Sequence, residues 1–198
     1  MIRIGLTGVS GSGKSYVTKL FHQYGISSVN TDEVVHDLYS FKNPCTETLS
    51  QVFGTDILCA DHAINRRKLA SIVFASKEKL QLLNHTVHPF VIEKVNDISK
   101  EKENQGAKAF LIEAPQLFEA GLENSCDYVI SVMSACETRI ERLVIRDGIT
   151  REMAEKRIAS QHSDSFFRDH SDFCIENNDG DDLESQVKLI LKEIGLLS

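Results

Sequence analysis

Apolar residues occur along the chain in two patterns, short continuous runs and longer stretches in which they recur every three or four positions. The first pattern is typical of buried β-strands and the second of amphipathic helices. Five short runs predict strands, at residues 2–7, 26–29, 109–113, 128–132 and 172–176. Because helical stretches separate these runs, the pattern predicts an α/β protein with a parallel sheet.

The helical pattern is clearest at residues 17–24, after the first strand, and Gly25 provides a stop signal there. Residues 34–106 are mostly helical in pattern, and a new helix is expected to begin at Pro89, whose missing N–H costs little in a first turn. Residues 43–65 have no clear periodicity, so no element is assigned to them. Further helices are predicted at residues 137–146, 151–160 and 183–194.

A glycine-rich segment between the first strand and the first helix reads G-V-S-G-S-G-K-S and matches the P-loop pattern G-x-x-x-x-G-K-[ST] at every fixed position. Its glycines let backbone N–H groups face phosphate oxygens, and the following helix adds the positive end of its dipole. Lys14 is expected to bridge the β- and γ-phosphates of ATP, and the Ser15 hydroxyl to ligate Mg²⁺. The predicted nucleotide-binding residues are Gly8, Gly11, Ser12, Gly13, Lys14, Ser15 and Tyr16.

Asp32 follows the second predicted strand directly. Ligands of open parallel sheets bind outside the carboxyl ends of the strands, so this carboxylate is expected at the same edge as the P-loop. There it can accept the proton of an attacking hydroxyl or orient that hydroxyl. Asp is also favoured at helix N-termini for structural reasons, so position alone leaves both interpretations open.

The overall composition argues against several classes of function. The net charge of -7 argues against non-specific nucleic-acid binding, and no apolar run reaches the 18 residues that a membrane helix needs. The five scattered cysteines form no C-x-x-C pair, and the chain enters a strand at once, without signal-peptide regions. We therefore expect a cytoplasmic protein that binds neither nucleic acid nor membranes.

Arg139, Arg142 and Arg146 lie on roughly one face of the predicted helix at residues 137–146. Guanidinium groups bind phosphates and can neutralise charge on a transferring phosphoryl group. A solvated helix face with nearby glutamates explains the same spacing, so the residues alone leave the two interpretations open.

Several motifs together resemble the dephospho-CoA kinase family, and the resemblance spans nearly the whole chain. The P-loop is shared with many families, whereas the other motifs are more specific in combination. They are Asn30-Thr-Asp32, Phe53-Gly54, Ile64-Asn-Arg66, Leu69 to Phe74, His88-Pro89, Glu113-Ala-Pro-Gln-Leu-Phe-Glu119, Glu141-Arg-Leu, Arg146-Asp-Gly, Arg157-Ile-Ala-Ser-Gln161 and Asp172-Phe-Cys-Ile-Glu-Asn177.

The resemblance implies a three-layer α/β/α P-loop kinase domain over residues 1–198, with a parallel sheet of five strands. Its implied parts are a core (residues 1–35, 107–138 and 169–198), a helical substrate-binding region (36–106) and a helical lid (139–168).

The resemblance also implies roles for single residues. Asp32 becomes the base, Lys14 and Arg142 act in catalysis, and Arg139 remains a surface residue by default. The remaining residues implied are Arg146 and Asn177 at the nucleotide, the latter near the adenine, and His88, Phe118 and Glu119 on the acceptor side.

Four positions depart from the family pattern. Asn30 and Glu113 each stand where Asp is usual, Tyr16 replaces a small hydroxyl residue, and Gln116 replaces Leu. Glu113 keeps the charge but reaches further, which can alter the geometry around a metal ion. None of the four removes Lys14, Ser15 or Asp32.

The function expected from the residues and the resemblance together is transfer of the γ-phosphate of ATP, with Mg²⁺, to the ribose 3′-hydroxyl of dephospho-CoA. A nucleoside or nucleoside-monophosphate kinase shares the same core and differs in the acceptor. A nucleotide switch is a further alternative, although the base-reading N-K-x-D element of such proteins is absent. We expect a monomer or a weak oligomer.

Overall fold

The structure is a computed structural model that describes residues 1–198. The chain divides into two compact units, one of Met1–Ser28 with Glu101–Ser198 and the other of Val29–Lys100. None of the helices is both long enough and apolar enough to cross a lipid bilayer.

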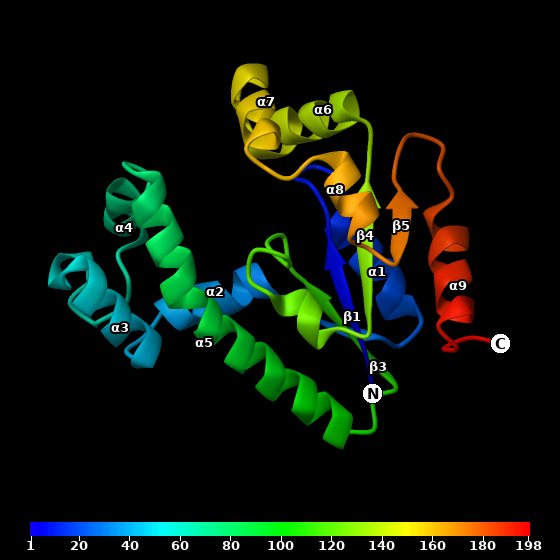
Figure 1. Ribbon diagram of the computed structural model, residues 1–198, viewed down its shortest axis with the longest axis horizontal. Helices are drawn as coiled ribbons and strands as arrows, with labels where there is room; N and C mark the ends of the chain where they lie inside the picture. Colours follow the sequence, from blue (N-terminus) through cyan, green and yellow to red (C-terminus); the bar gives the residue numbers. More distant parts are fainter. The chain divides into compact units, whose positions relative to one another are not determined.

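The first unit is built around a five-stranded sheet with the strand order β2-β3-β1-β4-β5 (Figure 1). The strand β2 spans the boundary between the two units, which lies after Ser28. The pairs β1–β3, β1–β4 and β4–β5 are parallel, with Leu6 opposite both Glu113 and Ile130. The predicted α/β class and parallel five-stranded sheet are therefore confirmed. The strands are β1 (Ile2–Thr7), β2 (Ser27–Asn30), β3 (Ala109–Glu113), β4 (Tyr128–Met133) and β5 (Phe173–Glu176).

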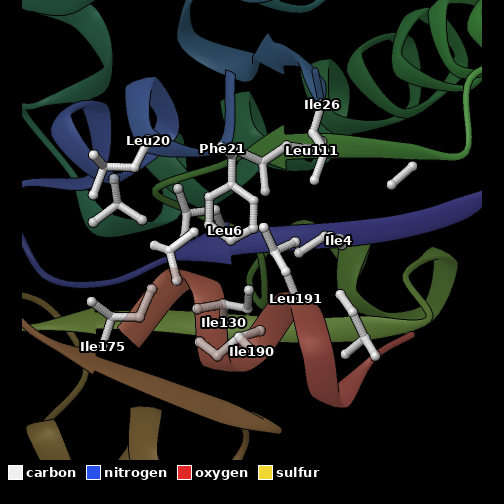
Figure 2. Close-up of a cluster of buried hydrophobic side chains, with 14 of the residues drawn as sticks. Ile4, Leu6, Leu20, Phe21, Ile26, Leu111, Ile130, Ile175, Ile190 and Leu191 are labelled. Atoms are coloured by element: carbon white, nitrogen blue, oxygen red, sulfur yellow. The ribbon is translucent and has the colours of Figure 1, made fainter. Parts of the chain in front are cut away.

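Two helices cover one face of this sheet, α1 (Lys14–Gln23) and α9 (Leu183–Glu193). Phe21 of α1 and Leu191 of α9 are both fully buried against the strands (Figure 2). Burial of an aliphatic or phenyl side chain contributes about 1.5–3 kcal/mol, so this layer holds α1 firmly against β1. The loop between β1 and α1 is thereby fixed at both ends.

Three further helices precede β5 in the first unit, α6 (Cys136–Asp147), α7 (Arg151–Ala159) and α8 (Asp164–Asp169). Figure 1 shows α6 and α7 side by side at one end of the unit. Thr150 caps α7 by accepting a hydrogen bond from the backbone N–H of Met153 at 3.3 Å. The helices α6 and α7 follow the predicted helices at residues 137–146 and 151–160 closely, whereas α8 was not predicted. A 3₁₀ turn, η2 (Leu122–Ser125), lies between β3 and β4.

The second unit is helical, as its sequence pattern predicts. Its elements are α2 (Thr31–Tyr39), α3 (Pro44–Phe53), η1 (Thr55–Ile57), α4 (Arg66–Val73) and α5 (Lys77–Asn104), the last of which continues past Lys100. Within the segment that lacked periodicity, Asn43 forms a capping box at the start of α3.

The prediction that a helix begins at Pro89 is wrong, because α5 runs through this residue. Proline inside a helix removes one backbone hydrogen bond and costs about 3 kcal/mol. However, Val87, Val91 and Val95 are buried at four-residue intervals on either side of Pro89. Continuous packing of this face offsets the local cost, so the helix does not end.

Candidate functional site

The P-loop adopts a conformation that only glycine tolerates at three positions. Gly8, Gly11 and Gly13 have φ values of 137°, 82° and 96°. A Cβ at Gly11 would lie 2.7 Å from the carbonyl oxygen of Arg139, and one at Gly13 would overlap Asn177 Nδ2. The glycines therefore serve both the turn itself and the close approach of neighbouring elements.

The predicted phosphate-binding groups lie together at the start of α1. Lys14 Nζ donates a hydrogen bond to the Gly8 carbonyl at 2.8 Å, so its ammonium group lies over the loop. The Ser12 side chain is fully buried, and its hydroxyl has no hydrogen-bond partner in the protein. A buried polar group normally has a partner, so this hydroxyl fits a phosphate oxygen as its ligand. The Tyr16 side chain is 56% exposed, on the outer side of the helix.

Ser15 is joined to the end of β3 through Glu113. The Ser15 hydroxyl donates to Glu113 Oε1 at 2.9 Å, and the Thr18 hydroxyl donates to Oε2 at 2.8 Å. Glu113 is only 5% exposed, so both oxygens of a buried carboxylate are satisfied. A hydroxyl beside a carboxylate is the oxygen-ligand chemistry that Mg²⁺ prefers. The sequence indicated that Glu113 can influence the geometry around a metal ion, whereas Thr18 was missed.

Asn177 and Arg142 also lie at the P-loop. Asn177 is buried, and its Nδ2 donates to the Ser12 carbonyl at 2.7 Å. Arg142 Nη1 would lie 3.8 Å from a Cβ at Gly13, and it is 3.5 Å from the Ser134 hydroxyl. Asn177 thus supports the loop backbone, while Arg142 brings a guanidinium group beside it.

Arg146 is engaged elsewhere. Its Nε and Nη2 donate to the two oxygens of Asp147 at 2.7 and 2.9 Å, and Arg157 reaches the same carboxylate at 2.9 Å. The hydrogen bonds from Arg146 hold the pKa of Asp147 below its ordinary value. The same contact raises the pKa of Arg146. In this structure Arg146 is part of a surface ion-pair network, whereas Arg142 lies beside the P-loop and forms one long ion pair, with Asp179 at 3.9 Å.

The expectation that Arg139 is a surface residue is wrong, because the residue is only 3% exposed. Its guanidinium group donates to both oxygens of Asp164, at 2.7 and 3.1 Å. Its backbone also lies against Gly11 of the P-loop. The helix face that carries Arg139 therefore packs inward, and Asp164 from α8 compensates the buried charge.

Gln161, between α7 and α8, is a site residue whose role the sequence did not reveal. Its Oε1 accepts a hydrogen bond from the backbone N–H of Ser10 at 2.9 Å. Val9 is buried in a cluster with Phe167 of α8 and Met133 of β4. The outer wall of the P-loop is thus formed by residues that follow α6 and α7. Gln161 belongs to a recognised motif, but nothing in its spacing indicates a partner in the P-loop.

Phe118 and Glu119 lie after β3 and contact the segment around α8. The Phe118 ring meets the Phe166 ring edge to face, with centroids 5.2 Å apart. Glu119 Oε1 is 3.6 Å from His162 Nε2, and the His162 ring stacks on Phe166 at 3.8 Å. Phe118 and Glu119, two of the three predicted acceptor-side residues, therefore lie at an aromatic cluster of the first unit.

Asp32 lies in the first turn of α2, in the second unit. Its backbone N–H donates to the side-chain oxygen of Asn30 at 2.9 Å, so the residue that replaces the usual Asp acts as the N-cap. Asp32 lines a cavity of about 210 Å³, together with residues of α2, α4 and α5. His88 is half-buried on α5 and does not line this cavity.

The family model and the curated relatives point to one family. A family model described as dephospho-CoA kinase matches residues 2–182. A Dephospho-CoA kinase from Corynebacterium glutamicum is 37% identical over 98% of both chains. Among solved structures, TT1252 from Thermus thermophilus has a TM-score of 0.80 at 30% identity, covering 98% of this chain and 97% of its own. A Dephospho-CoA kinase from Campylobacter jejuni has a TM-score of 0.70 at 25% identity, covering 97% and 96%.

Proposed function

Since the chain belongs to the dephospho-CoA kinase family, we propose that it transfers the γ-phosphate of ATP to the ribose 3′-hydroxyl of dephospho-CoA, giving CoA and ADP. The observation that carries this proposal is a complete P-loop, with Lys14 over the loop, in a chain that the family model matches from residue 2 to residue 182. The nucleoside-kinase and switch alternatives have no comparable support.

The P-loop supplies most of the groups that hold ATP. Its backbone N–H groups and the N-terminus of α1 face the phosphates, and the Ser12 hydroxyl offers one more buried donor. Lys14 neutralises charge on the β- and γ-phosphates. The Ser15 hydroxyl and the Glu113 carboxylate, 2.9 Å apart, are the residues that would hold Mg²⁺, which when bound withdraws charge from the phosphate oxygens. Glu113 also fixes the rotamer of Ser15.

Asp32 is proposed as the group that accepts the proton from the ribose 3′-hydroxyl. In a parallel sheet the carboxyl ends of all strands open at one edge, and Asp32 follows β2 as the P-loop follows β1. The 3′-oxygen then forms a bond to the γ-phosphorus, while the bond from that phosphorus to the bridging oxygen of ADP breaks. Asn30, as N-cap, fixes the backbone that carries Asp32.

Arg142 is proposed to neutralise charge on the transferring phosphoryl group, because it already lies beside Gly13. Residues 139–168 are proposed to act as a lid that excludes water, which otherwise competes with the acceptor. Arg146 and Asn177 are assigned to the nucleotide, and His88, Phe118 and Glu119 to the acceptor. For Asn177 the support is its contact with the Ser12 carbonyl, which keeps the loop in shape.

The test is ADP release from Mg·ATP in the presence of dephospho-CoA, AMP, CMP, adenosine or no acceptor. We expect strong stimulation by dephospho-CoA alone, with CoA as the product. Stimulation by a nucleotide or nucleoside instead would keep the P-loop chemistry and overturn the acceptor. Equal, slow ADP release under all conditions would favour a nucleotide switch.

A further inference from the structure

The strand β5 lies at one edge of the five-stranded sheet, and α9 lies beside it after a short loop (Figure 1). The inner side of β5 pairs with β4, where Met133 lies opposite Glu176. The outer side of an edge strand presents backbone N–H and C=O groups that have no partner strand. A partner for the outer side of Glu176, the last residue of β5, therefore has to come from outside the sheet.

Gln186 of α9 is this partner. Its side-chain Oε1 accepts a hydrogen bond from the Glu176 N–H at 2.9 Å, and its Nε2 donates to the Glu176 carbonyl at 2.9 Å. One amide group thus forms both hydrogen bonds that a neighbouring strand would form. The Gln186 side chain is half-buried and belongs to the first turn of α9, which Asp182 caps by accepting from the Ser185 N–H at 3.0 Å. Gln186 is therefore held firmly against β5.

The residue after Glu176 holds the P-loop. Asn177 is buried, and its Nδ2 donates to the Ser12 carbonyl at 2.7 Å. Ser12 carries the buried hydroxyl that has no hydrogen-bond partner in the protein. The peptide that joins Glu176 to Asn177 is fixed at both of its polar groups. Its carbonyl accepts from Gln186, and its N–H donates to the Met133 carbonyl at 2.8 Å. A rotation of this peptide would move the Asn177 side chain away from Ser12.

We propose that Gln186 is a positioning residue for the nucleotide site. It fixes the orientation of the peptide between Glu176 and Asn177, so that Asn177 supports the Ser12 carbonyl and the Ser12 hydroxyl faces a phosphate oxygen. Gln186 itself lies on α9, outside the P-loop, and acts through Asn177. The inference rests on that part of the proposed function in which the P-loop binds ATP.

The first test compares Gln186→Leu with Gln51→Leu, the same substitution at an exposed position of α3. Affinity is measured as the dissociation constant of Mg·ADP by calorimetry and as the KM for ATP at saturating dephospho-CoA. Gln186→Leu is expected to raise both about 3- to 10-fold, which corresponds to the net contribution of about one hydrogen bond. Its kcat and its KM for dephospho-CoA stay within about twofold, and Gln51→Leu behaves as wild type. Unchanged nucleotide affinity in Gln186→Leu would overturn the proposal.

Ile194→Ala separates this effect from a general loss of stability. Ile194 is buried in the core at the far end of α9, so the substitution lowers the melting temperature without touching Glu176. It is expected to keep the wild-type dissociation constant of Mg·ADP. An equal rise in Ile194→Ala and Gln186→Leu would mean that the stability of α9 governs nucleotide affinity, which contradicts the proposal.

Gln186→Glu is the second variant, and it keeps a polar side chain at this half-buried position. As a carboxylate it accepts from the Glu176 N–H but has no donor for the Glu176 carbonyl. The dissociation constant of Mg·ADP is expected to rise as in Gln186→Leu, because the carbonyl belongs to the peptide that carries Asn177. A wild-type value would show that the donated hydrogen bond is not needed and would overturn the proposal.

A double-mutant cycle with Asn177→Ala tests whether Gln186 acts through Asn177. If it does, Gln186→Leu adds little once Asn177 is gone, so the double variant binds Mg·ADP within about twofold of Asn177→Ala. Effects that multiply in the double variant would overturn the proposed connection. Wild-type protein without dephospho-CoA-dependent ADP release would instead refute the proposed function. Since the binding of Mg·ADP needs no acceptor, the two failures are distinguishable.

Discussion

The Ser15 hydroxyl donates a 2.9 Å hydrogen bond to Oε1 of Glu113, which links the first turn of α1 to the carboxyl end of β3. The partner strand β1 carries the P-loop, and Leu6 of β1 lies opposite Glu113. The Glu113 carboxylate at the end of β3 thus orients the Ser15 hydroxyl of the P-loop, which follows the neighbouring strand β1. Thr18 satisfies the second oxygen of the carboxylate, so the longer Glu fits where the family pattern has Asp.

Glu113→Gln is expected to weaken the use of Mg²⁺ with little change in stability. The amide keeps one acceptor oxygen for Ser15, but it loses the charge that favours a cation. Changes to groups that support a metal site typically cost 10- to 100-fold in affinity, and we expect a shift of about that size in the Mg²⁺ concentration for half-maximal ADP release. The control is Glu193→Gln on the exposed side of α9, which should titrate like wild type. An unshifted Mg²⁺ titration in Glu113→Gln would remove this role.

Asp32→Asn is expected to lower kcat at least 100-fold with an unchanged melting temperature. Asn keeps the size of the side chain and the backbone N–H that Asn30 caps, but it cannot take the proton of the acceptor hydroxyl. Lys14→Ala is expected to cause a comparable loss through the phosphates. Rates are measured by ADP release with dephospho-CoA, and Asp61→Asn on an exposed turn is the control. Wild-type-like turnover in either variant would refute the role given to that residue.

The sequence predicted those features that depend on local pattern. The P-loop is a contiguous motif, and the strands and most helices follow from apolar periodicity, so these agree with the structure. Pro89 was misread because the continuous packing of Val87, Val91 and Val95 offsets its local cost of about 3 kcal/mol. Rules based on local sequence preference do not include the stability gained from a buried helix face, because that face forms only in the folded unit.

Arg139 and Gln161 were misjudged from the sequence for a different reason. Arg139 pairs with Asp164, and Gln161 contacts Ser10 at the opposite end of the sequence. Helical spacing gives the face on which Arg139 lies, but it does not say which face packs inward. Such assignments need the positions of partners distant in sequence, which the fold supplies.

Asp164→Ala is expected to destabilise the protein by about 2–4 kcal/mol, because it leaves the buried guanidinium group of Arg139 without its carboxylate. The lower part of that range is favoured since the Asp164 side chain is 48% exposed. The matched control is Glu152→Ala, which breaks the pair with Lys156, where both side chains are about three-quarters exposed. Such a surface pair is worth about 0–1 kcal/mol. Urea unfolding measures both values, and equal values would mean that Arg139 gains nothing from Asp164.

Gly11→Ala and Gly25→Ala separate backbone strain from steric conflict in the P-loop. Both glycines have positive φ, at 82° and 76°, so alanine costs about 1–2 kcal/mol at either position. At Gly25 nothing lies within 4 Å of the added Cβ, whereas at Gly11 the Arg139 carbonyl lies 2.7 Å away. We therefore expect Gly25→Ala to lose only that stability and to keep its KM for ATP. Gly11→Ala should lose more stability and raise the KM for ATP at least tenfold, because the loop and α6 must move apart. Equal effects of the two substitutions on both quantities would mean that the contact between Gly11 and α6 does not shape the nucleotide site.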